Sequence, residues 1–261
     1  LLIFEGLGVQ PPEFAHLPLL IAPDGSKLSK RRHGAVVSVT TYRDAGFLPH
    51  AFVNFLCLLG WSPKDNREYM TLTELIEAFN LEGIKRANAV VNFTDKDPLD
   101  PKAVWLNSQH LRAMPIEELA RRVRPLMERA GLPVPGDEAH FYRLLDVLRT
   151  RYQTLNDFVT RGIAYFSDDY PIEPAALEKL NAPGARELLH ELADRLETDA
   201  EFSEQSVENI LRGLAAERGV KAGLIINAAR AALTGQTVGP SAFTVFVMLG
   251  KDRVLRRLRR V

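Results

Sequence analysis

The stretch PDGSKLSKRRHG, residues 23–34, follows an apolar run and sets two lysines, Lys27 and Lys30, three residues apart. Proline, aspartate and glycine at its start are typical of a turn. Backbone N–H groups of a loop and lysine ammonium groups can together hold a polyphosphate. A basic run of this length is more often a solvated turn. The stretch alone leaves both interpretations open.

The composition is that of an ordinary globular protein. The 261 residues can hold two or three domains, and 46% of them are hydrophobic and 25% charged. The formal net charge is +0, so a surface that binds nucleic acid would need local clustering of base. The one cysteine, Cys57, excludes an internal disulfide and fits a reducing cytoplasm. No apolar run reaches the roughly 20 residues of a membrane span, and we expect a cytoplasmic monomer without membrane contact.

The apolar periodicity is helical along most of the chain. Residues 14–21 read as a strand, and residues 83–101, with Asp95 and Asp97, read as a loop. A helix that begins after Thr71 has a capping box. The opening LLIFEGLG reads as a helix end stopped by glycine, and we expect the chain to be part of something longer. Further helices are expected at 48–59, 72–79, 101–111, 116–131, 138–150, 154–165, 174–180, 184–197, 203–217, 221–233 and 241–260.

The lysine stretch gains meaning from its neighbours. Residues Lys27, Leu28, Ser29, Lys30 and Arg31 resemble the KMSKS loop of class I aminoacyl-tRNA synthetases, in the form typical of glutamyl-tRNA synthetases. Other blocks similar to that family follow its order along the whole chain: HLPLL at 16–20, HGA at 33–35, YRDAGFLP at 42–49, NFLCLLGW at 54–61, WLN at 105–107, AARAALTG at 228–235 and LGKDR at 249–253.

One signature of the family is missing. No histidine of these 261 residues stands in a His-x-Gly-His/Asn pattern, the HIGH-type motif of the nucleotide-binding fold. The resemblance therefore implies the C-terminal half or so of a glutamyl-tRNA synthetase, and we expect this chain alone not to aminoacylate.

The resemblance also implies a fold that is mainly α. Residues 1–113 would hold the remnant of the class I α/β catalytic domain, with the KMSKS-like loop, and a helical stem-contact domain. Residues 114–163 and 164–261 would be two helical anticodon-binding subdomains. Glutaminyl-tRNA synthetases carry C-terminal β-barrels, so the helical pattern argues against them.

The reaction implied by the resemblance is the joining of L-glutamate to tRNA(Glu) through a glutamyl-adenylate made from ATP. Lys30 would be the catalytic, ATP-contacting lysine, while Lys27, Leu28, Ser29 and Arg31 would complete the loop. A lysine is a flexible point charge that can follow phosphates as they move. Mg²⁺ is expected to accompany ATP, and no metal site is expected in this chain.

Arginines are the implied contacts to tRNA. By resemblance, Arg151 occupies the position that senses the third anticodon base, and its guanidinium, a pure donor, favours the acceptor edge of cytosine. Such an enzyme would reject the glutamine tRNA. Arg230 is a second candidate, although a cation at a helix end can simply stabilise the C-terminus. Arg149, Lys251 and Arg253 complete the set of expected tRNA contacts.

The C-terminal tail is strongly basic. At helical spacing Arg253, Arg256, Arg257 and Arg260 share one face, which can meet phosphate or simply face solvent. Asp168 and Asp169 read as turn formers. Trp61 and Trp105 are expected to anchor packing. Two other functions remain open, namely a free-standing module that binds tRNA anticodons and a helical interaction scaffold.

Overall fold

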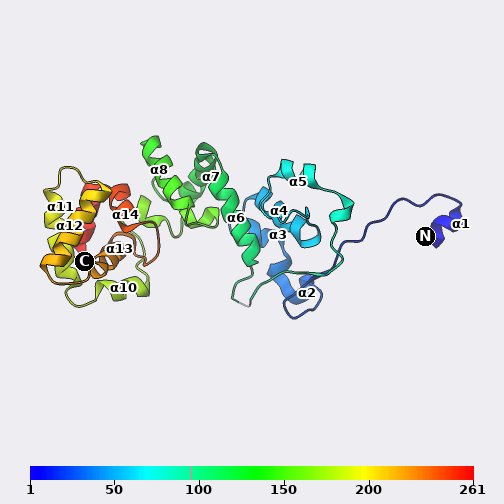
Figure 1. Cartoon of the computed structure of the whole chain (residues 1–261), viewed down its shortest axis with the longest axis horizontal. Coiled ribbons are helices and arrows are strands. Elements are labelled where there is room, and N and C mark those ends of the chain that lie inside the picture. The colour runs from blue at the N-terminus through cyan, green and yellow to red at the C-terminus, as the bar shows by residue number, and fades with distance from the viewer. Residues whose placement is uncertain (95) are drawn as a thin grey trace. The chain divides into compact units, whose positions relative to one another are not determined.

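The computed structural model describes residues 1–94 and 96–261, so Asp95 lies outside the described residues. The chain forms two compact units, Leu1–His110 and Leu111–Val261. Both are built mainly of helices (Figure 1), as predicted. No helix in the described part of the chain is both long and apolar enough to cross a membrane. The predicted boundary at residue 163 within the second unit stays a prediction.

The first unit combines short helices with one pair of strands. Strand β1 (Leu20–Ile21) pairs in parallel with β2 (Ala89–Val90), with Leu20 opposite Ala89. Its helices are α1 (Leu2–Leu7), α2 (Lys30–His33), α3 (Val39–Asp44), α4 (Pro49–Gly60), α5 (Leu72–Ala78) and α6 (Pro101–Ala113), the last of which runs into the second unit. Figure 1 shows α1 at the end of an extended segment, and none of its residues is buried.

The strands correct two predictions. The strand expected over 14–21 is reduced to two residues, and Pro18, which lacks an N–H, cannot donate to a ladder. The expected loop over 83–101 contains β2, which is held by a partner far away in sequence. A two-residue parallel pairing leaves no local period for a sequence reading to detect.

Two buried asparagines fix the chain around the first core. The Asn107 side-chain oxygen accepts a hydrogen bond of 2.8 Å from the Leu48 N–H, and Asn54 accepts one of 3.0 Å from the Met70 N–H. Both asparagines are 0% exposed. Trp61 is buried as expected, but Trp105 is 43% exposed and does not anchor the core. The hydrophobic core of this unit consists of Tyr42, Phe47, Phe55, Leu58, Trp61, Met70, Leu75, Ala103 and Leu106.

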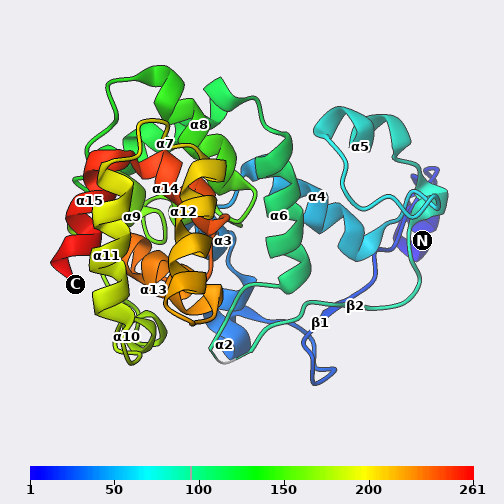
Figure 2. The same cartoon turned by 60° about the vertical axis from the view of Figure 1, so that its left-hand side comes forward.

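All the regular elements described in the second unit are helices. Helix α13 contacts six other helices of the unit, α9, α10, α11, α12, α14 and α15 (Figure 2). Its alanines at 228, 229, 231 and 232 are buried, and such small side chains let neighbours approach from several sides. The helices are α7 (Ile116–Arg129), α8 (Glu138–Arg149), α9 (Ile163–Phe166), α10 (Pro174–Leu180), α11 (Ala185–Glu197), α12 (Glu204–Glu217), α13 (Ala222–Thr234), α14 (Ala242–Leu249) and α15 (Lys251–Arg260).

Two predicted helices are interrupted. The helix expected over 154–165 is a 3₁₀ turn, Leu155–Phe158, followed by α9. The helix expected over 241–260 breaks at Gly250, whose φ of 80° and ψ of 152° are outside the helical region. In both cases the helical spacing of apolar residues continues across the break, so periodicity alone predicts one continuous helix.

Candidate functional site

The lysine stretch folds as a tight hairpin that leads into a short helix. The Leu28 N–H donates to the Leu20 carbonyl at 3.0 Å, and the Ala22 N–H donates to the Ser26 carbonyl at 2.8 Å. Gly25, with φ of 79°, makes the turn between them. The predicted turn at residues 23–25 is therefore confirmed, and it returns Lys27 alongside β1.

Ser29 and Asp24 brace the loop from within. The Ser29 hydroxyl accepts from the Arg32 N–H at 3.3 Å and caps α2, and the Ser29 N–H donates to Nδ1 of His33 at 3.1 Å. Asp24 pairs with Arg32 at 3.1 Å. Hydrogen bonds from Ser26, followed by the charges of Arg32 and His33, lower the pKa of Asp24. Ser29 and Arg32 therefore stabilise the conformation of the loop.

The remaining cations of the loop face outward. Lys27, Lys30 and Arg31 are exposed. Within residues 1–94 and 96–261 none of the three forms an ion pair. A cavity of about 410 Å³ lies beside the two lysines, with Lys27 and Lys30 among its polar lining and side chains such as Val37 and Phe52 among its apolar lining. This arrangement suits a ligand that has both an anionic and an apolar or planar part.

Arg151 and Arg230 lie near each other in the second unit. Arg151 is exposed just after α8. Arg230 is half-buried on α13, and its Nη1 donates to the Pro240 carbonyl at 2.6 Å. Burial lowers the pKa of Arg230, and the neighbouring charge of Arg151 lowers it further. Over the described residues no carboxylate pairs with either arginine, so the pair suits a ligand rich in acceptors or negative charge.

The other three predicted tRNA contacts have partners inside the protein. Arg149 donates to the Met114 carbonyl at 2.5 Å and pairs with Asp146. Lys251 donates to the Glu197 and Asp199 carbonyls, each at 2.7 Å, near the end of α11. Arg253 donates to the Tyr165 carbonyl at 3.0 Å. Their contact with tRNA stays a prediction.

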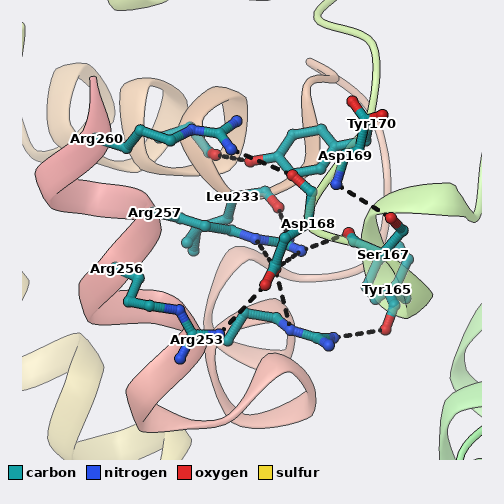
Figure 3. Close-up of polar contacts among 11 residues, drawn as sticks. Tyr165, Ser167, Asp168, Asp169, Tyr170, Leu233, Arg253, Arg256, Arg257 and Arg260 are labelled. Carbon is teal, nitrogen blue, oxygen red and sulfur yellow. Dashed lines mark hydrogen bonds and ion pairs between the residues drawn. The ribbon is translucent and has the colours of Figure 1, made fainter.

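The sequence reading missed a cluster around Asp168. The carboxylate of this expected turn former forms ion pairs with three arginines of α15, Arg253, Arg256 and Arg257 (Figure 3). Burial alone would raise the pKa of Asp168, but the hydrogen bond and charge of Arg257, with help from the other two arginines, produce a net lowering. We call these four residues the Asp168 cluster.

The cluster corrects the expectation of an exposed basic face at one of its four arginines. Arg257 is only 2% exposed, whereas Arg256 and Arg260 of the same predicted face are exposed. A signal for this was available, because the apolar residues Val254 and Leu258 stand three residues before and one residue after Arg257, which places it near the apolar stripe of the helix.

No group of three or more His, Cys, Asp or Glu side chains in the described ranges could hold a metal ion.

Two family models match the chain. Residues 118–261 match the anticodon binding domain, and residues 1–97 match the catalytic domain of class I tRNA synthetases (E and Q). The first match covers more than half of the chain.

Named relatives align with nearly the whole length of the chain. The glutamate–tRNA ligase of Solibacter usitatus is 46% identical over 98% of this chain and 53% of its own length. A glutamate–tRNA ligase of Thermus thermophilus is 40% identical over 99% of this chain and 53% of its own. The chain thus spans about half the length of these relatives.

A solved structure agrees with the sequence relatives. The glutamate tRNA ligase of Elizabethkingia meningosepticum, crystallised with its amino acid, superposes with a TM-score of 0.80 at 27% identity, over 99% of this chain and 53% of that one. The resemblance first seen in the KLSKR loop and its neighbouring blocks is therefore confirmed. The chain belongs to the glutamyl-tRNA synthetase family, of which it carries part of the class I catalytic domain and the anticodon-binding domain.

Proposed function

We propose that this chain is the part of a glutamate–tRNA ligase that supplies the ATP-contacting lysine loop and binds tRNA(Glu). The observation that carries the proposal is the likeness to named glutamate–tRNA ligases over 98% of the chain, at 46% identity. The match of residues 1–97 to a catalytic domain favours a ligase over a free-standing anticodon-binding module.

The proposed reaction has two steps. The carboxylate of L-glutamate attacks the α-phosphorus of ATP, giving glutamyl-adenylate and pyrophosphate. A hydroxyl of the terminal ribose of tRNA then takes the glutamyl group and releases AMP. Mg²⁺ bound with ATP would neutralise phosphate charge. The protein's task in such a transfer is mainly positioning and electrostatic stabilisation.

Lys30 is the residue proposed to meet the phosphates. Lys30 is exposed and directly follows Ser29, whose hydroxyl caps α2. Because negative charge builds up on the departing pyrophosphate, a nearby ammonium stabilises the transition state more than the ground state. Lys27 and Arg31 add positive potential around the same loop.

Replacing Lys30 with alanine tests this role in the full-length enzyme. We expect glutamate-dependent exchange of pyrophosphate into ATP to fall by about a hundredfold or more, because one charge-stabilising contact of the transition state is lost. Affinity for tRNA should remain. Lys179→Ala, which removes an exposed lysine of α10, is the control and should exchange normally. Normal exchange by Lys30→Ala would refute the assignment.

Binding of tRNA is proposed for both units. The helices that follow the lysine loop in the first unit would meet the inner face of the L-shaped tRNA. The second unit would hold the anticodon, with Arg151 donating to the third base and Arg230 beside it. Single-stranded anticodon bases are accessible to such contacts because their Watson–Crick edges are unpaired.

A further inference from the structure

Arg257 is a buried cation whose hydrogen bonds reach three different residues. Its Nη1 donates to the Leu233 carbonyl at 2.5 Å, and its Nη2 donates to the Ser167 carbonyl at 2.7 Å. Nε and Nη2 both donate to Oδ1 of Asp168, at 3.1 and 2.7 Å (Figure 3). The guanidinium also lies over the Tyr170 ring, 4.5 Å from its centroid. A guanidinium buried in this way is stable only when such partners are in place.

These partners belong to separate parts of the second unit. Ser167 directly follows α9, whereas Leu233 lies in the last turn of α13. We call residues 167–173 the connector, because they join α9 to α10. Arg257, which comes from a third element, α15, therefore holds the connector against the C-terminal end of α13.

Two further contacts fasten the connector at the same place. The Tyr170 hydroxyl donates to the Ala232 carbonyl, and the Glu173 N–H donates to the Gly235 carbonyl at 2.8 Å. A Cβ at Gly235 would lie 2.1 Å from the Pro171 carbonyl oxygen, so the two backbones approach as closely as glycine permits.

The connector separates the two arginines proposed to read the anticodon. Arg151 precedes it, next to α8, while Arg230 follows it on α13. Arg230 is one helical turn from the anchored end of α13, where the Thr234 hydroxyl donates to the Arg230 carbonyl at 2.8 Å. A change in how the connector sits on α13 would therefore alter the spacing between Arg151 and Arg230.

We propose that Arg257 is a positioning residue for anticodon recognition, which fixes the relative placement of Arg151 and Arg230 by holding the connector on α13. The inference rests on the proposed function of those two arginines. Arg257 is too buried to meet a phosphate itself. It therefore acts on the selection of anticodon sequence and not on general attraction to RNA.

Arg257→Lys tests the proposal in the full chain. Lysine keeps the charge but loses the planar fork that spans the two carbonyls and the carboxylate. The measured quantity is the selectivity ratio, which is the dissociation constant for tRNA(Glu) with its third anticodon base changed from cytosine to guanine divided by the dissociation constant for unchanged tRNA(Glu). We expect the ratio to fall about tenfold. The slope of affinity against salt should match the unchanged protein, because no phosphate contact is removed.

Arg256→Gln is the matched control. Arg256 directly precedes Arg257 in the same helix, and its Nη2 lies 3.2 Å from Oδ2 of Asp168. Unlike that of Arg257, its side chain is 63% exposed. Its loss should leave the selectivity ratio unchanged. If Arg257→Lys folds and keeps the ratio of the unchanged protein, the inference is overturned. If it does not fold, Tyr170→Phe, which removes only the hydroxyl contact, takes its place and is judged by the same ratio.

The Arg151→Ala background separates failure of the inference from failure of the proposed function. If Arg151→Ala alone leaves the selectivity ratio unchanged, Arg151 does not read the base and the proposed function of that site fails. If Arg151→Ala lowers the ratio and Arg257→Lys then lowers it no further, the positioning role is supported. An equal further loss in that background would show that Arg257 acts elsewhere and would overturn the inference.

Discussion

His110 is a polar side chain held inside the first unit. Its Nε2 lies 3.1 Å from Oδ1 of Asn54, an atom that can only accept, so the imidazole donates there. The Asn54 amide is itself oriented by its bond to the Glu68 carbonyl at 2.9 Å. Burial, together with the nearby His50, lowers the pKa of His110 from 6.5 to about 4. The folded unit therefore holds this imidazole neutral.

The pKa of His110 predicts how stability depends on pH. Between pH 6.5 and about 4 the unfolded chain takes up a proton at this residue and the folded chain does not, so the free energy of unfolding falls as pH falls through that window. Urea unfolding followed by tryptophan fluorescence measures it, because both tryptophans, Trp61 and Trp105, lie in the first unit.

His110→Gln removes the titrating group and should flatten that dependence. Equal m-values for the two proteins serve as the control, since they show that the same surface is exposed on unfolding. The same loss of stability toward pH 4 in both proteins would contradict the prediction.

Whether the role of a residue can be predicted from the sequence depends on whether its signal is local. The lysine loop was found because a short motif and its neighbours carry family information, and its turn follows from proline, aspartate and glycine chemistry. Asp168 was missed because its role depends on arginines about 90 positions later. The apolar neighbours of Arg257 indicate that it lies near the buried stripe of its helix, but no local pattern identifies Asp168 as its partner.

Among the elements, Gly250 decides where the helix predicted over 241–260 divides into α14 and α15. With φ of 80° and ψ of 152° it occupies a region that is essentially restricted to glycine. The break turns α15 so that Arg257 meets Asp168 and the end of α13. The long helix predicted over 241–260 would have had no such turn.

Gly250→Ala should lower the free energy of unfolding of the second unit by about 1–3 kcal/mol, because alanine is strained in this conformation. Urea unfolding followed by far-UV circular dichroism measures the change. Gly213→Ala, within α12 and with open space around the added methyl group, is the matched control and should raise stability by about 0.5–1 kcal/mol. A Gly250→Ala protein as stable as the control would show that the backbone break is not needed.

Helix prediction succeeded where the chemistry of the ends is local. Helix α5 begins at the predicted capping box. The Thr71 N–H donates to the Glu74 carboxylate at 2.8 Å. Helix α10 has the predicted bounds, from Pro174 to Leu180. The parallel strands were the least predictable element, because neither strand has a period of its own and each is defined by the other.

For the molecule as a whole, its two compact units match two different family models. Residues 1–97, with the lysine loop, match the catalytic domain, and residues 118–261, with Arg151 and Arg230, match the anticodon binding domain. A net charge of +0 means that tRNA affinity must come from local groups. Many cations of the second unit are already paired internally, so the exposed Arg151 and the half-buried Arg230 carry more of the proposed recognition.

Binding of this chain to tRNA(Glu) is the most direct test of the proposed function. The dissociation constant should rise steeply with salt, because phosphate contacts release counterions. It should also be about tenfold higher for the same tRNA with its third anticodon base changed to guanine, as expected when a base-edge contact is lost. Affinity that ignored both the salt concentration and the anticodon base would contradict recognition of tRNA through the anticodon.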